Sequence, residues 1–401
     1  MDDGKELYTG IERSYLKFKW SVDIVPMRIT QFGGGQESLK ADKKALRDYT
    51  KELERDPDFI ALWISKGNLL KRMGRFDEAI RCYDRALDID RKYILAWVCK
   101  GNILTDLKRY DEAIKCYDRA LYIDPHRVGV WIAKGSILVE LGRRDDAIKC
   151  HENVLRINPK HAAALVAKGS ALRSMGELEE AIECYDKALE VDPERVAVWM
   201  AKGSILEELE MPNDAMRCYD RALEIDPNFV FAWINKGSIL AGIGMPKEAV
   251  RCFDQALKIE PQLEGGWVNK GIVLKILGMR KEALQCYDRV LKRNPNFMAV
   301  WIAKGSVLGE LGKVKEAIKC YDKALEIDPN FVHAWINKGS MLAEMGKVEE
   351  AVKCYDKALI IEPKLPGAWI NKSLALKYLG KREEAMECYD RALEIDPQYV
   401  S

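Results

Sequence analysis

The sequence predicts an all-α fold, an α-solenoid of about ten helical hairpins that follow one another along the chain. The first observation is that ten of the eleven cysteines recur every 34 residues. They are Cys82, Cys116, Cys150, Cys184, Cys218, Cys252, Cys286, Cys320, Cys354 and Cys388. The second is that each interval of 34 residues contains two apolar patterns of helix length. A period maintained ten times indicates a repeat array, and not the two or three compact domains that 401 residues would otherwise suggest.

The first helix of each copy is predicted from an apolar pattern around a tryptophan. In the first copy it comprises Trp63, Ile64, Gly67, Leu70 and Met73, and spacings of three and four place these residues on one helical face. A glycine four residues after the tryptophan recurs in nine copies. These glycines are Gly67, Gly101, Gly135, Gly169, Gly203, Gly237, Gly271, Gly305 and Gly339. A further glycine ends this helix in eight copies, where a left-handed conformation is easiest for glycine.

The second helix of each copy follows the same logic. In the first copy its face comprises Ala79, Ile80, Tyr83, Ala86 and Leu87. Proline ends this helix in nine copies, because proline lacks an amide hydrogen and crowds the preceding turn. A small residue opposite a large ring lets two helix backbones approach closely, so each copy is predicted to be a helical hairpin.

The predicted organisation has three parts. Ten copies of 34 residues begin at Ile60 and cover 340 of the 401 residues. Their ranges are 60–93, 94–127, 128–161, 162–195, 196–229, 230–263, 264–297, 298–331, 332–365 and 366–399. Residues 38–59 are expected to form a degenerate half repeat that acts as an N-terminal cap. Residues 1–37 are expected to form an irregular extension, with a strand-like alternation at 18–24; the alternative is that this segment docks in a groove or against a partner.

The repeat carries a family resemblance. One copy supplies the residues Trp233, Gly237, Leu240, Ala249, Phe253, Ala256 and Pro261. This pattern resembles the signature of the tetratricopeptide repeat, and the chain is similar to tandem arrays of the prokaryotic and archaeal type. The resemblance implies a right-handed superhelix whose concave groove is lined mainly by the first helices. It implies binding of other proteins and no particular activity.

Composition restricts the environment and the partners. The chain has 64 Lys and Arg against 63 Asp and Glu, a net charge of +1, so nothing attracts nucleic acid in bulk. Stretches of 18 apolar residues are absent, and the first thirty residues mix charges throughout, which argues against a transmembrane helix and a secretory signal. We expect a cytoplasmic protein with a protein or peptide partner, without nucleic acid or membrane as partners.

Catalytic, metal and cofactor sites are not expected. The sequence has no phosphate loop, no H-E-x-x-H and no Ser/His/Asp set with its turn context. Each copy offers one cysteine, whereas a zinc site needs clustered ligands. We therefore expect reduced thiols that pack as small apolar groups.

The candidate peptide-binding residues begin with a position that varies among the copies, two residues after the tryptophan. Asparagine occupies it at Asn235, Asn269, Asn337 and Asn371. By the resemblance this position faces the groove, similar to the asparagine ladder of O-linked N-acetylglucosamine transferase. An amide offers both a donor and an acceptor to a peptide bond, whatever the side chains of the peptide. The alternative is that these are ordinary solvated polar residues.

Two further positions extend the same helical stripe. Three residues on lie Asn68 and Asn102, and seven residues on lie Glu140, Glu208, Glu310 and Glu344, so a polar, partly acidic groove is expected. A partner segment with basic residues and an accessible backbone would suit it. A lysine one residue before each first-helix glycine is expected to pair with an acid of a packed helix, the alternative being a ligand-binding role.

These observations favour a non-enzymatic protein-interaction scaffold that binds an extended peptide or a helix of a partner in its groove. The alternative is a structural protein that polymerises head-to-tail through an uncapped C-terminal end. In that reading Met386, Tyr389 and Leu393 receive no following helix, and self-association occurs through the C-terminal repeat.

Overall fold

The computed structural model describes residues 36–397, which form 21 helices and no strand. The helices are α2 (Gln36–Arg55), α3 (Ile60–Arg72), α4 (Phe76–Ile89), α5 (Ile94–Asp106), α6 (Tyr110–Ile123), α7 (Val128–Glu140), α8 (Arg144–Ile157), α9 (Ala162–Met175), α10 (Leu178–Val191), α11 (Val196–Glu208), α12 (Pro212–Ile225), α13 (Val230–Gly242), α14 (Pro246–Ile259), α15 (Glu264–Ile276), α16 (Arg280–Leu291), α17 (Met298–Glu310), α18 (Val314–Ile327), α19 (Val332–Glu344), α20 (Val348–Ile361), α21 (Pro366–Tyr378) and α22 (Arg382–Ile395). The all-α prediction is confirmed. The strand-like alternation expected at 18–24 lies outside the described residues.

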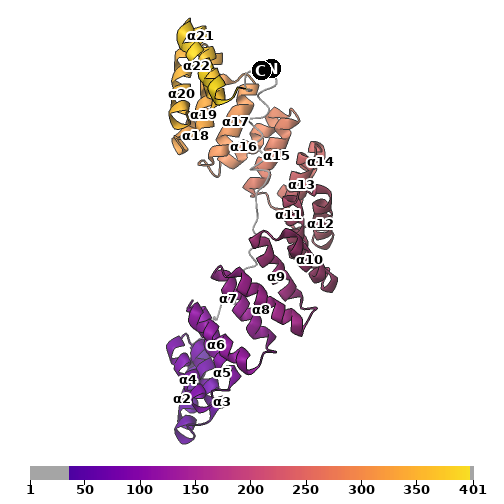
Figure 1. The fold of residues 1–401 in the computed structure, drawn as a ribbon, viewed down its shortest axis with the longest axis vertical. Coiled ribbons are helices and arrows are strands. Elements are labelled where there is room, and N and C mark those ends of the chain that lie inside the picture. The colour runs from indigo at the N-terminus through magenta and orange to yellow at the C-terminus, as the bar shows by residue number, and fades with distance from the viewer. Residues whose placement is uncertain (1–35, 398–401) are drawn as a thin grey trace. The chain divides into compact units, whose positions relative to one another are not determined.

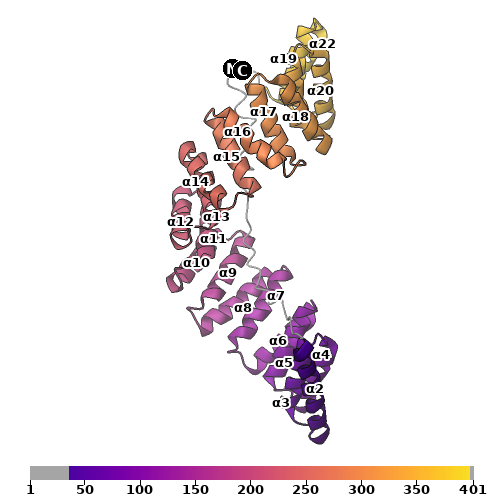
Figure 2. The same cartoon turned by 180° about the vertical axis from the view of Figure 1, so that it is seen from behind.

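The helices fall into two compact units, one with α2 to α12 and the other with α13 to α22. Within each unit consecutive helices pair as hairpins, and each hairpin stacks on the next (Figures 1 and 2). Ahead of the first hairpin, α2 packs on α3 and buries Leu53. No helix in residues 36–397 is long and apolar enough to cross a membrane.

The first helices of neighbouring hairpins also contact each other directly. In one unit α3 contacts α5, and in the other α15 contacts α17, α17 contacts α19 and α19 contacts α21. Contacts of similar extent are not formed between second helices in the described residues. The first helices are therefore the closer-spaced row in each unit, which is where a groove built on the stack would lie.

The turn between the two helices of a hairpin needs a left-handed residue. Gly74 has a φ of 76°, and its amide donates to the carbonyl of Lys71 at 3.0 Å. In two hairpins a side-chain residue takes this conformation instead, Lys108 and Glu210, both with a φ of 58°. Such residues cost about 1 kcal/mol relative to glycine, since their Cβ crowds the backbone. The turn geometry is thus imposed by the stack, even where the local residue disfavours it.

In nine of the ten hairpins of the repeats the core contains a contact between the first-helix glycine and an aromatic ring of the second helix, and the last hairpin has Ser373 in place of the glycine. Tyr83 is fully buried, and a Cβ added to Gly67 would lie 2.5 Å from its Cε1. Ala79 and Ala86 on either side of the ring are also fully buried. The ring that fills the space over the glycine is therefore the tyrosine of the second helix.

The tryptophans have a different role, at the loop that joins one hairpin to the next. Each of the nine tryptophans in residues 36–397 is only partly buried, and its Nε1 donates to the backbone carbonyl six residues earlier, as Trp131 does to Pro125 at 2.8 Å. In the second hairpin Trp97 makes the same bond to Arg91, at 2.9 Å. The indole thus forms a hydrogen bond to the loop that follows the preceding second helix, whether or not the loop contains proline.

Candidate functional site

Three of the four predicted asparagines occupy equivalent positions on first helices of the unit that contains α13 to α22. Asn235 lies on α13, Asn337 on α19 and Asn371 on α21. All three side chains are half-buried. Their amides have no hydrogen-bond partner within residues 36–397, so both the donor and the acceptor remain available to a ligand.

The fourth asparagine differs from the others. Asn269 on α15 is 2% exposed, and its Nδ2 is buried without a hydrogen-bond partner. In the equivalent place five repeats earlier, Cys99 contacts the hydroxyl of Tyr83. At the repeat before Asn269 the ring is Phe253, which has no hydroxyl. The Nδ2 of Asn269 is thus left without a partner in the one repeat pair where the ring of the preceding repeat is a phenylalanine and carries no hydroxyl.

Asn68 and Asn102 already serve the fold. Their Oδ1 atoms accept hydrogen bonds from the hydroxyls of Tyr83 and Tyr117, each at 2.8 Å. Both asparagine side chains are exposed, so their Nδ2 atoms still face solvent. Sequence reasoning missed this second role, although tyrosine and asparagine recur 15 residues apart in both hairpins.

Two of the four predicted acids of the stripe are paired with cations of the preceding hairpin. Arg173 Nη2 lies 2.7 Å from a carboxylate oxygen of Glu208. Glu310 is paired with Arg280 at 2.8 Å and with Lys275 at 3.5 Å. The basic residue stands 30 or 35 positions before the acid, and this spacing in the sequence would have predicted the ion pairs.

The remaining two acids of the stripe are placed differently. Glu140 accepts a hydrogen bond from the hydroxyl of Tyr110 and has no ion pair within the described range. Glu344 has neither an ion pair nor a hydrogen bond to another side chain in residues 36–397. Of the four predicted acids, Glu140 and Glu344 are therefore the two without an ion pair in the described residues, and the partly acidic groove stays a prediction.

Eight lysines at the position before the first-helix glycine pair with an acid of the preceding hairpin's second helix; they are Lys100, Lys134, Lys168, Lys202, Lys270, Lys304, Lys338 and Lys372, the last of which precedes Ser373. Lys304 Nζ lies 2.5 Å from Oδ1 of Asp288, and Lys338 Nζ lies 2.6 Å from Oδ1 of Asp322. The lysine side chains are about a fifth exposed, which buries the stem and leaves the ammonium at the surface. The expected pairing with an acid of a packed helix is confirmed, and these lysines connect neighbouring repeats.

The cysteines behave as apolar core residues. All eleven are free thiols, and ten are buried. Burial raises the pKa of Cys116 and Cys286 to about 11, so their thiolates are scarce at neutral pH. Within residues 36–397 no three His, Cys, Asp or Glu side chains are grouped so as to hold a metal ion.

The last hairpin exposes apolar side chains. On α22, Met386 is 64% exposed and Tyr389 is 37% exposed, and Leu393 is half-buried. On α21, Leu374 and Tyr378 are 59% and 80% exposed. Met386 and Tyr389 are three residues apart on one face of α22, whereas Leu374 and Tyr378 stand three and seven residues after Asn371, on the same stripe of α21 as that asparagine.

Comparisons with known proteins give the same repeat. Three family profiles, each described as Tetratricopeptide repeat, match the chain. The first matches residues 60–93, 94–127, 162–195, 196–229, 299–331 and 332–365, the second 128–161, 265–297 and 366–399, and the third 218–251. No curated protein sequence matches the chain.

Several solved structures are similar to it. A tetratricopeptide repeat protein from Parabacteroides merdae is 17% identical with a TM-score of 0.48, covering 66% of this chain and 98% of its own. The hetero-tetramer Cut9-Hcn1 of the APC/C gives 14% identity and a TM-score of 0.45, covering 91% and 92%. YrrB, described as having an unusual peptide-binding site, gives 24% identity and a TM-score of 0.41, covering 46% and 95%.

Proposed function

Because the chain belongs to the tetratricopeptide repeat family, we propose that it is a non-enzymatic scaffold that holds an extended peptide or a helix of a partner protein along its first helices. The supporting observation is the set of half-buried amides without a partner at Asn235, Asn337 and Asn371. They occupy the same position of the sixth, ninth and tenth repeats, where they can bind the backbone of a peptide at separate points. Affinity then comes from many weak contacts along a long surface.

The proposed partner segment is tolerant of sequence, since an amide recognises the peptide bond itself. Basic side chains in the segment are favoured near Glu344, the acid of the stripe without an ion pair in the unit that contains the three asparagines. Asn269 does not contact the peptide in this proposal, because its side chain is buried.

The test is selection from a display library of random peptides, followed by affinity measurement on the selected peptides. The test variant carries Asn235→Ala, Asn337→Ala and Asn371→Ala. The matched control carries three alanines at exposed loop asparagines of the same unit, Asn228, Asn296 and Asn330. We expect the test variant to lose most of its affinity and the control to keep it. Equal affinities for the two variants would show that the amide ladder is not the site.

A second candidate function is self-association through the last hairpin, favoured by the exposed Met386 and Tyr389. Sedimentation analysis over a range of concentrations tests it. Replacement of both residues by Lys is expected to remove any association, and a single monomeric species of the wild type at every concentration would eliminate this candidate.

A further inference from the structure

A pocket of about 670 Å³ lies where the first hairpin meets the second. It is formed by the end of α4, the loop to α5, the start of α5 and the last turns of α6. Its lining residues are Asp84, Leu87, Asp88, Arg91, Lys92, Trp97, Arg119, Tyr122 and Ile123. Its volume falls in the range of ligand pockets, and none of the predicted groove residues contributes to it.

The first departure from the repeat at this pocket is Arg91. It replaces the proline that the other nine copies have, and Lys92 follows it, so two exposed cations stand in one loop. The loop keeps its geometry, since Trp97 Nε1 still donates to the Arg91 carbonyl at 2.9 Å. The side chain of Arg91 is therefore an addition to the repeat that the fold does not require.

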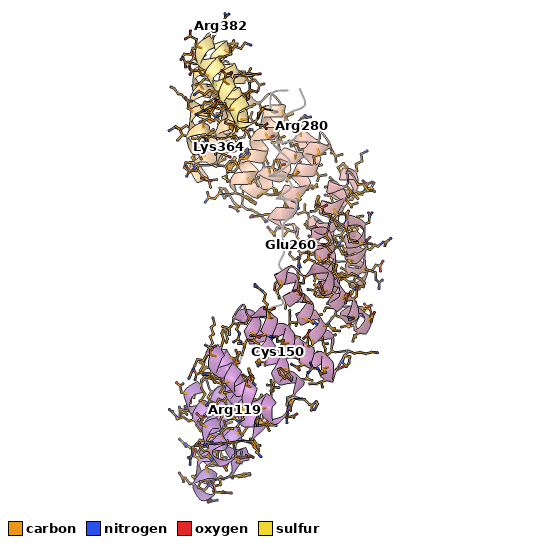
Figure 3. All side chains as sticks on the ribbon, in the orientation of Figure 1. Arg119, Cys150, Glu260, Arg280, Lys364 and Arg382 are labelled. Atoms are coloured by element: carbon orange, nitrogen blue, oxygen red, sulfur yellow. The ribbon has the colours of Figure 1, made fainter. Side chains whose placement is uncertain are left out.

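The second departure is the pair Arg119 and Tyr122. In four other copies the cation at this place of the second helix pairs with an acid three residues later, among them Lys323 with Glu326 at 2.6 Å and Arg391 with Glu394 at 2.7 Å. On α6 the acid is replaced by Tyr122, which is 84% exposed. Arg119, labelled in Figure 3, is thus left without an ion pair within residues 36–397.

The two acids of the pocket are engaged by neighbouring cations. Asp84 Oδ1 lies 2.5 Å from Lys100 Nζ, and Asp88 Oδ2 lies 3.6 Å from Arg85 Nη1. Among the described residues neither Arg91 nor Lys92 has an ion pair. The pocket therefore presents three unpaired cations beside an apolar surface.

That apolar surface is supplied by Leu87, Trp97 and Ile123, with the phenol of Tyr122 at the edge. Two guanidinium groups can each bind a carboxylate in a bidentate manner, and an indole and a phenol offer flat surfaces to an aromatic ring. A ligand that fits both features carries carboxylates next to an aromatic side chain.

We propose that this pocket is a second binding site, for an acidic peptide segment that contains an aromatic residue. Residues that recur in every copy of a repeat maintain the architecture, whereas departures clustered at one junction create recognition. Arg91, Lys92 and Arg119 bind the carboxylates, and the ring packs on Trp97 and Tyr122. The chemistry is opposite to that expected for the groove, where the unpaired charges are acidic.

The experiment uses the full chain and a fluorescein-labelled copolymer of glutamate and tyrosine as the probe, with binding followed by fluorescence polarisation. The test variant is Arg91→Pro with Tyr122→Glu, which gives the loop the proline of the other nine copies and gives α6 an acid to pair with Arg119. We expect affinity to fall at least about tenfold, as for the loss of two charged contacts. Any binding of a copolymer of lysine and tyrosine is expected to be the same in the wild type and the test variant, because neither substitution touches the groove.

The control variant is Ile360→Glu with Lys364→Gln, which changes the net charge by the same amount in the other unit. Ile360 is 74% exposed and stands three residues after Lys357, as Tyr122 stands three residues after Arg119. The control should bind the probe as the wild type does. Arg119→Gln is a surface substitution that leaves the loop unchanged. It should weaken binding by itself, so it tests the proposal even if the reversion variant folds poorly.

Three outcomes would overturn the proposal. One is unchanged affinity in both the reversion variant and Arg119→Gln. Another is an equal loss in the charge-matched control, which would mean attraction to overall charge. The third is tighter binding of a single-stranded oligonucleotide that the reversion abolishes, which would assign the pocket to phosphate.

Discussion

A Cβ atom on Gly101 would lie 2.6 Å from Cε1 of Tyr117, closer than such atoms approach in folded proteins. Gly101 belongs to α5 and Tyr117 to α6, and both are buried. A glycine meets a ring in the same way in eight other hairpins, so the glycine sets how closely the two helices of these hairpins approach.

Gly101→Ala is therefore expected to destabilise the second hairpin by about 2 kcal/mol, because the buried ring of Tyr117 must move. Gly129→Ala is the matched control, since a Cβ there meets nothing within 4 Å and a helical alanine is favoured over glycine. Hydrogen exchange of amides in α5 and α6 measures the loss. Protection that is the same in both variants would refute the packing argument.

The ion pair of Lys304 with Asp288 joins two repeats and leads to the next prediction. Asp288→Asn leaves a lysine with a mostly buried stem without its acid, at a cost of about 1 kcal/mol. Glu316→Gln breaks the ion pair of Glu316 with Lys313, three residues earlier in the chain. Both side chains are about half exposed, so this substitution should cost less than about 0.5 kcal/mol. Thermal unfolding of the two variants at low and high salt gives the comparison, and a larger loss for Glu316→Gln would contradict it.

Much of the fold could be predicted from the sequence because each repeat faces the same packing problem. The 34-residue period, the glycine under the ring and the glycine that ends the first helix are local and recur, so they identify the hairpin without knowledge of the neighbours. Lys108 and Glu210 replace the glycine that ends the first helix, and they still adopt its left-handed conformation because the stack determines the turn.

The candidate site was less predictable, because its properties depend on pairs of residues from different repeats. The paired state of Glu208 requires knowing that Arg173 reaches it from the preceding hairpin. The pocket at Arg91 is defined by a proline and an acid that are missing, and a missing residue does not appear as a motif. The chemistry of its ligand depends on Arg91, Lys92 and Arg119, which the fold brings to one pocket from two different repeats.

The buried amide of Asn269 leads to a prediction of stabilisation. Phe253→Tyr supplies a hydroxyl at the place where Tyr83 contacts Cys99 in an earlier repeat pair, and the Nδ2 of Asn269 can then be satisfied. The gain expected for one buried hydrogen bond is about 1 kcal/mol.

A double-mutant cycle isolates this effect. Phe253→Tyr should raise the unfolding temperature of the wild type but leave that of the Asn269→Ala variant unchanged or lower. An equal change in both backgrounds would mean that the hydroxyl does not reach the amide.

His151 gives the chain a local dependence on pH. It occupies the tyrosine position of α8, is 2% exposed, and neither ring nitrogen has a hydrogen-bond partner. Burial lowers the pKa of His151 to about 4, from 6.5 for an exposed histidine. Between these two values the unfolded chain binds a proton that the folded chain does not, so stability falls as the pH decreases from about 6.5 to 4. The full loss is about 3 kcal/mol.

His151→Tyr should remove this dependence, because the ring fits the position and Ser136 is placed to bond its hydroxyl, as Ser170 lies 3.2 Å from that of Tyr185. Hydrogen exchange in α7 and α8 at pH 7 and pH 4.5 provides the measurement. The wild type should lose protection there at the lower pH, while His151→Tyr keeps it. His126→Gln, at an exposed histidine, should behave as the wild type does. If His151→Tyr loses as much protection as the wild type, the acid sensitivity of this hairpin has another origin, such as its carboxylates.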